Sequence, residues 1–348
     1  MSTLDISRRI VAPRSRDLSL DAAVTGMAFL ADGTLVVAAG DGMVRLVPPD
    51  AAMRELPVHE EGAAALTLAM DLDGRSVLTG GDDGRLMRTS ADGTVSTVFH
   101  APGRQIDTIA VSAAGRVRAV ATGKQVHLID HDGAVLRSAG NHPSTVTGLD
   151  FHPKGKRLAV SHYGGVTLSW TGTLGHSPTR LGWQGSHIGV SWSPDGSVVM
   201  STMQEAALHG WRPANGDHFQ MNGYAAKVRS MDWLAKPMTL FTAGSDCVLA
   251  WSFAGRGPAG KPPIELCQGV GRLVTVVGVH PIRPLVAAGF DDGRLALCDI
   301  AGEKIVRLRP GDGGRATALA WSSDGRRLAV GTDAGIVSLF NLSQTGSV

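Results

Sequence analysis

Five histidines are the side chains best suited to chemistry in this sequence: His59, His100, His142, His162 and His187. Imidazole nitrogen is a common ligand of zinc and other borderline metals. A zinc site needs three or four ligands within about 2.0–2.1 Å of one ion. The chain has 12 histidines among 348 residues, so several would share any face by chance, and some will brace the fold through hydrogen bonds. A metal site is therefore an alternative hypothesis, which depends on whether the fold brings these imidazoles together.

A second set of side chains suits recognition of another protein. Aromatic residues and arginine are enriched at interface hot spots because they bury a large area and can also form hydrogen bonds. The alternative for each residue singly is a solvated loop side chain with no partner. As a group, we predict that the following residues bind a protein or peptide: Arg104, His142, Trp183, His187, Tyr224, Lys227, Arg272 and Arg315.

Motifs of catalysis and cofactor binding are missing or incomplete. The segment Gly255–Lys261 contains GxGxxG but runs into Pro262 and Pro263, whereas a dinucleotide site needs a helix there. The acidic turn Asp71–Gly74 lacks the bidentate glutamate and flanking helices of a calcium loop. We find no GxSxG elbow, P-loop or HExxH. The sequence predicts no catalytic residue and no cofactor, so we expect a protein that is not an enzyme.

The elements that position these residues follow from an internal repeat. An apolar residue that ends a strand and stands four residues before a turn recurs at steps of 41, 41, 40, 41, 41, 46 and 42 residues. Regular spacing of about 40 residues predicts repeated structural units. A strand begins five residues before each marker, which places the inner strands near residues 24, 65, 106, 146, 187, 228, 274 and 316. The markers are Phe29, Met70, Val111, Phe151, Trp192, Trp233, Val279 and Trp321.

Each unit contains four predicted strands. Turns such as Ser193–Gly196 (SPDG) contain the Asp and Gly that tight hairpins require. The third run of each unit alternates apolar and polar residues, as in VTLSW at 166–170, which predicts a strand. A four-stranded sheet has two faces to cover, and stacking sheets around an axis covers both. The sequence therefore predicts an all-β fold, a single closed β-propeller of eight four-stranded blades.

The period, the SPDG-like turns and a third strand that ends near Trp-Asp resemble the WD-repeat family, of bacterial type. The tryptophan position is kept as Trp170, Trp211 and Trp251, and Cys298 occupies it in a later unit. The resemblance covers essentially the whole chain and implies a scaffold that binds partners through its loop face. Because most relatives have seven blades, seven is the alternative number.

Closure of the ring predicts a clasp at the N-terminus. The last unit ends with its third strand near Leu342, and a spare segment, Ile6 to Ala12, precedes the first unit. We expect this segment, within residues 1–13, to pair with the final blade and cover its edge. Residues 1–348 would then form one propeller domain.

The architecture also groups the candidate residues. Loops from an outer strand to the next inner strand share one face with loops between second and third strands. All the recognition residues and the five histidines lie on or beside these loops, so we expect them around one rim of the central channel. We predict a non-catalytic scaffold with a protein or peptide partner, alone or in a multiprotein complex.

Composition narrows the partners and the location. The chain has 33 basic and 31 acidic residues, a balance that argues against nucleic acid as an obligate partner. No apolar run is long enough to span a membrane, and the N-terminus lacks the apolar region of a signal peptide. The three cysteines, Cys247, Cys267 and Cys298, show no CxxC spacing and predict buried free thiols in a reducing compartment. We expect a cytoplasmic protein without a membrane partner.

Overall fold

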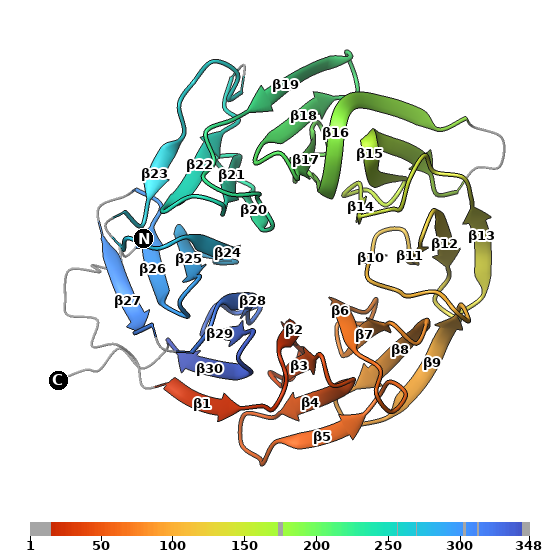
Figure 1. Cartoon of the computed structure of the whole chain (residues 1–348), viewed down its shortest axis with the longest axis vertical. Coiled ribbons are helices and arrows are strands. Elements are labelled where there is room, and N and C mark those ends of the chain that lie inside the picture. The colour runs from red at the N-terminus through yellow and green to blue at the C-terminus, as the bar shows by residue number, and fades with distance from the viewer. Residues whose placement is uncertain are drawn as a thin grey trace.

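Short antiparallel strands make up the regular structure of this chain. The computed structural model describes residues 15–172, 177–255, 257–268, 270–301, 304–311 and 313–342. These residues form 30 strands and no helix, so none offers a helix that could cross a membrane. The sheets stand around a central axis with their first strands innermost (Figure 1). The prediction of an all-β propeller is confirmed.

The first three sheets follow the predicted four-stranded order. The first contains β2 (Val24–Phe29), β3 (Leu35–Ala39), β4 (Met43–Val47) and β5 (Arg54–Pro57). The second contains β6 (Ala65–Met70), β7 (Ser76–Gly81), β8 (Arg85–Ser90) and β9 (Val95–His100). The third contains β10 (Ile109–Ser112), β11 (Val117–Thr122), β12 (Gln125–Ile129) and β13 (Val135–Ala139).

The last three sheets repeat this order, and the final one borrows its outer strand. The fifth contains β20 (Met231–Leu234), β21 (Thr239–Thr242), β22 (Val248–Ser252) and β23 (Ile264–Leu266). The sixth contains β24 (Val274–Val279), β25 (Leu285–Phe290), β26 (Leu295–Asp299) and β27 (Ile305–Arg309). The seventh contains β28 (Ala316–Trp321), β29 (Arg327–Thr332), β30 (Ile336–Asn341) and β1 (Ser15–Ser19).

The fourth sheet has six strands and joins two sequence repeats. It contains β14 (Gly148–Phe151), β15 (Arg157–Trp170), β16 (Thr179–Trp192), β17 (Val199–Met203), β18 (Leu208–Arg212) and β19 (Asp217–Met221). The first part of β15 pairs with β14, and the part after Tyr163 pairs with β16. Strand β16 then pairs with β17 from His187 onward. Each of the two 14-residue strands therefore serves two strand positions.

This shared sheet corrects the predicted number of blades. Counted as continuous hydrogen-bonded sheets, the ring has seven blades, which was the alternative, and eight separate four-stranded blades are not formed. The eight sequence repeats remain, but the fourth and fifth run into each other through β15 and β16. The spacing of the apolar markers gives the number of repeats. It does not show whether the last strand of one repeat continues into the first strand of the next, as β16 does.

Burial falls from the inside of each sheet to its outer strand. Every residue of β3, β7 and β25 is buried, because neighbouring sheets cover both of their faces. Outer strands such as β5 and β13 are mostly exposed. Packing of sheet against sheet therefore supplies the core.

Threonine hydroxyls join the inner strands of adjacent sheets around the ring. Thr275 Oγ1 donates to the carbonyl of Ala316 at 2.7 Å, and Thr317 Oγ1 donates to that of Val24 at 2.7 Å. Thr147 makes the same contact with the His187 carbonyl. The Thr317 bond joins the last sheet to the first, and β2 packs beside β28 (Figure 1). The ring is closed through side chains as well as through apolar packing.

An N-terminal strand completes the last blade, although not the segment expected. Strand β1 pairs antiparallel with β30, from Ser15 opposite Phe340 to Ser19 opposite Ile336. The predicted clasp, Ile6 to Ala12 within residues 1–13, lies outside the described residues. The partner of β30 is thus the segment that leads directly into β2, which leaves a short connection to the first inner strand.

The cysteines also differ from expectation. Cys267 and Cys298 form a disulfide with their Cα atoms 5.8 Å apart, so the prediction of free thiols is wrong at both positions. The outer-strand segment carrying Cys267 packs against the third strand of the next sheet, a contact that sequence spacing does not reveal. Cys247 is a free, buried thiol, and burial raises its pKa to about 11.

Candidate functional site

The rim predicted for partner binding presents mainly cations. Arg104, Arg272 and Arg315 are exposed, and Lys227 is partly exposed. They stand in the loops before β10, β24, β28 and β20, each of which leads from an outer strand to the next inner strand. Because these loops share one face of the propeller, the four side chains belong to one surface.

Short polar contacts hold this rim. Arg272 lies 3.2 Å from Asp292, and its side chain remains 53% exposed. The backbone N–H of Arg315 donates to Asp333 at 2.8 Å, which fixes its loop against the turn of its own sheet. Lys227 Nζ donates to Gln204 Oε1 at 3.4 Å, between two sheets. A partner would meet cations on loops that are already ordered.

Three other predicted contact residues are buried: Tyr224, His187 and His142. The Tyr224 hydroxyl accepts a hydrogen bond from Trp251 Nε1 at 2.8 Å and lies 2.9 Å from Thr242 Oγ1. His187 Nδ1 lies 2.7 Å from Ser201 Oγ. These polar links join the loop to the second and third strands of the sheet. Tyr224 and His187 therefore brace the fold, and sequence position alone did not separate bracing from recognition.

Trp183, the remaining predicted contact, is half-buried in β16. Its ring stacks on His209 with centroids 4.0 Å apart, and His218 lies on the same ring system. Its carbonyl faces His187 Nε2 at 3.0 Å. Most of the indole is committed to the fold, so little of it remains for a partner.

The five histidines proposed as metal ligands are not brought together. His59 Nδ1 lies 3.1 Å from Asp83 and its Nε2 lies 3.1 Å from Thr79 Oγ1, so both nitrogens have partners inside the second sheet. His162 Nε2 lies 2.8 Å from Thr167 Oγ1, and His100 is exposed at the end of β9. Only His142 and His162 have rings in contact, with centroids 5.8 Å apart.

Burial disfavours the charged form of three of these histidines, His142, His162 and His187. It lowers the pKa of His142 to about 4, with the charge of neighbouring His162 acting in the same direction. Burial also lowers the pKa of His162 and of His187. In the part of the chain that is described, the one group of three potential metal ligands with their atoms near one another is Asp130, His131 and Asp132, which lies in the turn before β13.

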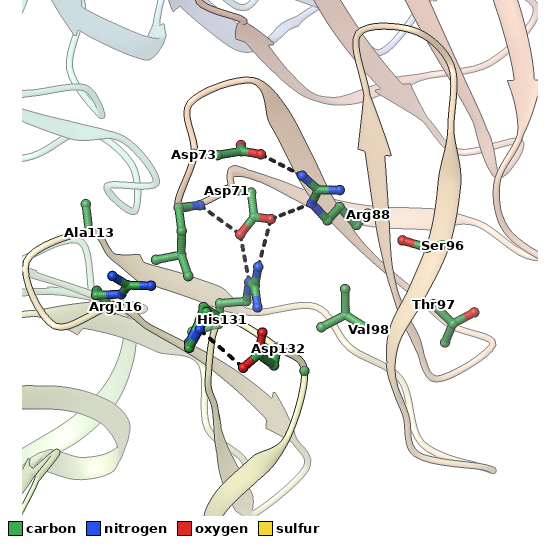
Figure 2. Close-up of a pocket in the computed structure, with 13 residues that line it drawn as sticks. Asp71, Asp73, Arg88, Ser96, Thr97, Val98, Ala113, Arg116, His131 and Asp132 are labelled. Carbon is green, nitrogen blue, oxygen red and sulfur yellow. Dashed lines mark hydrogen bonds and ion pairs between the residues drawn. The ribbon is translucent and has the colours of Figure 1, made fainter.

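A polar groove that sequence reasoning missed lies between the second and third sheets (Figure 2). Its volume is about 680 Å³. The turn after β6, the outer strand β9, the turn after β10 and the turn between β12 and β13 form its walls. The lining residues are Asp71, Leu72, Asp73, Arg88, Ser96, Thr97, Val98, Ala113, Arg116, Arg118, His131, Asp132 and Gly133.

Asp71 holds the floor of this groove. Arg118 Nε and Nη2 donate to its two oxygens at 2.7 and 2.9 Å, and Arg88 Nε donates at 2.9 Å (Figure 2). Burial alone would raise the pKa of Asp71, but hydrogen bonds from Arg118 and the Leu72 N–H, with the Arg118 charge, hold it below its usual value. Arg88 also donates to Asp73 at 2.6 Å. The Asp71 carboxylate thus links the second sheet to the third through Arg118, which lies 47 residues later in the sequence.

The sequence contained a partial signal for the groove. The sequence of Asp71–Gly74 predicts a tight turn, and Asp73 does cap it by accepting from the N–H of Arg75 at 2.9 Å. Asp71 instead reaches across to the next sheet. Arg118, near the start of β11, occupies a position where neighbouring repeats carry an apolar residue, as Val77 and Leu158 show. This difference was the signal in the sequence that pointed to a polar contact here.

Comparisons with known proteins agree with this architecture. Residues 17–47 match the WD domain, G-beta repeat, and residues 280–348 match the WD40 domain of anaphase-promoting complex subunit 4. Eukaryotic translation initiation factor 3 subunit I of Lodderomyces elongisporus is 23% identical over 187 residues, which are 48% of this chain and 51% of that protein. The chain therefore spans about half the length of this curated relative. A bacterial type of repeat finds no support in these matches.

Solved structures share the fold at low identity. The computationally designed Ika8 protein has a TM-score of 0.76 at 20% identity, covering 93% of this chain and 97% of that one. The C-terminal WD40 domain of Sif2 has a TM-score of 0.74 at 16% identity, covering 95% and 99%. A chain of the mitotic checkpoint complex has a TM-score of 0.63 at 14% identity, covering 98% and 95%. WD40 repeats and a β-propeller are supported together.

Proposed function

We propose that this protein is a non-catalytic WD40 platform that binds a protein partner through the rim carrying Arg104, Lys227, Arg272 and Arg315. The observation that carries the proposal is the exposure of these cations on loops braced by buried side chains. A surface that is ordered before binding loses little conformational freedom when a partner docks. Arginine is also a frequent hot-spot residue at protein interfaces.

Relatives make assembly into a complex a reasonable expectation. The matched names include a subunit of the anaphase-promoting complex, a subunit of a translation initiation factor and a chain of the mitotic checkpoint complex. Each of these names describes a part of a multi-subunit assembly. We extend to this chain only the general role, a subunit that holds other proteins, and no particular complex.

Charge reversal on the rim tests the platform. We would capture partners with tagged full-length protein and compare the wild type with Arg272→Glu plus Arg315→Glu. The matched control is Arg283→Glu plus Arg326→Glu, because these exposed arginines follow the inner strands of the same two sheets, at the opposite end. We expect the rim variant to lose its stoichiometric partner and the control to keep it. Equal retention by both variants would place the binding surface elsewhere.

The metal-binding alternative has little geometric support. Both ring nitrogens of His59 and of His162 form hydrogen bonds within the protein, and the five candidate imidazoles do not lie together around one point. Elemental analysis of protein purified without an affinity tag tests this alternative directly. Stoichiometric zinc lost on His142→Ala and His187→Ala would favour it over the platform.

A cytoplasmic location is a further part of the proposal. Disulfides are rare in the cytosol. The disulfide between Cys267 and Cys298 counts against this location. Thiol trapping in intact cells tests it, because a cytoplasmic protein should carry these two cysteines reduced. A fully oxidised pair in freshly trapped protein would argue for an oxidising compartment.

A further inference from the structure

We propose that the groove between the second and third sheets, with three cations beside it, binds an extended acidic segment of a partner protein. This site lies at the end of the strands opposite the rim, so it goes beyond the platform proposed above. It is formed by the turns that follow inner strands and by the outer strand β9.

Arg116 is the cation of the groove that remains available. Arg88 and Arg118 are both engaged by Asp71. Arg116 is exposed and makes no ion pair with any described carboxylate, and it lines the groove from the same turn as Ala113 (Figure 2). Its backbone is left-handed, with φ 51°. A bulky residue in this conformation is uncommon and is held here by the tight turn before β11.

Two lysines extend the positive charge onto the next turn. The turn containing Gly115 packs on the turn containing Gly155, where a Cβ atom added to Gly115 would lie 3.0 Å from the Gly155 carbonyl oxygen. The contact has no room for a side chain at either glycine, so the two turns lie close together. Arg116 follows Gly115, and Lys154 and Lys156 flank Gly155, so this contact brings the three cations into neighbouring turns. Both lysines are exposed and have no ion pair among the described residues.

The opposite side of the groove offers a strand edge. Strand β9 is the outermost strand of its sheet and pairs with β8 alone in the described structure. Ser96, Thr97 and Val98 of β9 line the groove. An unpaired edge is a template for an extended peptide, which gains main-chain hydrogen bonds there.

Charge and shape together favour an acidic peptide. Asp71 and Asp73 bind Arg88 and Arg118, so the charged side chains outside these ion pairs are Asp132 on one hand and Arg116, Lys154 and Lys156 on the other. Uncompensated charge is therefore positive. Three cations on a chain of net charge +2 supply little affinity for nucleic acid or an anionic membrane at physiological salt. A short carboxylate-rich strand matches both the cations and the edge.

Fluorescence anisotropy tests this site with a labelled synthetic peptide of alternating glutamate and threonine. The groove variant is Arg116→Gln, Lys154→Gln and Lys156→Gln. The control variant is Lys236→Gln, Arg283→Gln and Arg326→Gln, which removes three exposed cations from the equivalent turns of other sheets. We expect affinity to fall by about tenfold or more in the groove variant and to stay unchanged in the control.

Two modified peptides separate the contribution of charge from that of main-chain hydrogen bonds. A peptide in which glutamine replaces glutamate should bind weakly, and backbone N-methylation should weaken the acidic peptide because it removes donors to β9. No binding by the wild type, or the same loss in both variants, would overturn the proposal. Tighter binding of single-stranded RNA or of phosphatidylserine vesicles than of the peptide would also overturn it. Because the rim is intact in the groove variant, these results do not depend on the partner captured by the rim.

Discussion

Trp183 stacks on His209 with ring centroids 4.0 Å apart and ring planes 21° from parallel. His209 is completely buried, and neither ring nitrogen has a hydrogen-bond partner among the described residues. Burial, reinforced by the charges of His218 and His187, lowers the pKa of His209 to about 3. The imidazole is therefore neutral at pH 7 and acts as an aromatic spacer in the six-stranded sheet.

Acid should unfold the protein partly through His209. Its folded pKa lies below the ordinary value of 6.5, so the unfolded state binds more protons, and stability is lost as the pH falls from 6.5 toward about 3. His209→Phe keeps the stack and removes the titration. We expect a shallower decline in the free energy of unfolding, measured by urea denaturation. His218→Phe, at an exposed position in the same stack, is the control, and identical slopes for the wild type and His209→Phe would contradict the assignment.

Asp150 should have the opposite dependence on pH. Burial raises its pKa to about 6, although its Oδ2 accepts from the Trp192 N–H at 2.7 Å. The folded state then holds the proton more tightly, so stability is full below pH 3.8 and is lost as the pH rises through 6. Asp150→Asn keeps an acceptor without the charge. We expect it to be more stable than the wild type at pH 8 by roughly 1–3 kcal/mol.

Asp195→Asn is the matched comparison for this effect. Burial would raise the pKa of Asp195, but hydrogen bonds from Ser193 and Ser197 lower it. Its carboxylate therefore favours the folded state above the ordinary pKa, and the amide should lower stability at pH 8. Melting curves at pH 5 and pH 8 distinguish the two variants, and a shift of the same sign in both would contradict the role of burial.

The repeat made the fold predictable because each strand position repeats the same burial. The starts expected near 24, 65, 274 and 316 coincide with β2, β6, β24 and β28. The merged fourth sheet was not predictable, since it arises where β16 runs without a break from its pairing with β15 into its pairing with β17. Local sequence gives the tendency to turn but not whether two strands become continuous.

The candidate site was less predictable than the fold. Arg272 and Arg315 were expected to be exposed on loops, and they are. Tyr224 occupies a similar loop but is buried, because its hydroxyl meets Trp251 and Thr242 from strands 18 to 27 residues later. The groove depends on Asp71 meeting Arg118 across two sheets, a pairing that no local pattern reports.

Removing Arg118 should strongly destabilise the contact between the second and third sheets. Asp71 and Arg118 are both buried, so Arg118→Met leaves a buried carboxylate with Arg88 as its remaining cation. Breaking a buried ion pair by removing one partner costs about 3–5 kcal/mol. Urea denaturation measures the loss. Adding Asp71→Leu to Arg118→Met should recover much of it, and a double variant no more stable than Arg118→Met would show that the carboxylate was not the cause.

The pairing of β1 with β30 should govern whether the ring stays closed. Ser15 to Ser19 cover the edge of β30, Leu18 packs on the core of the first and last sheets, and the buried Leu20 donates its N–H to Gly335 at 2.9 Å. Deletion of residues 1–19 removes this cover and exposes an unpaired edge, which favours association between chains. We expect the melting temperature to fall by roughly 5 °C or more and dimers to appear in size-exclusion chromatography. Deletion of residues 1–14 alone keeps β1 and is the control. If that shorter deletion produced the whole loss, or if both truncated proteins melted like the full chain, β1 would not be the element that closes the ring, and the hydroxyl link from Thr317 to Val24 would have to hold the first and last sheets together.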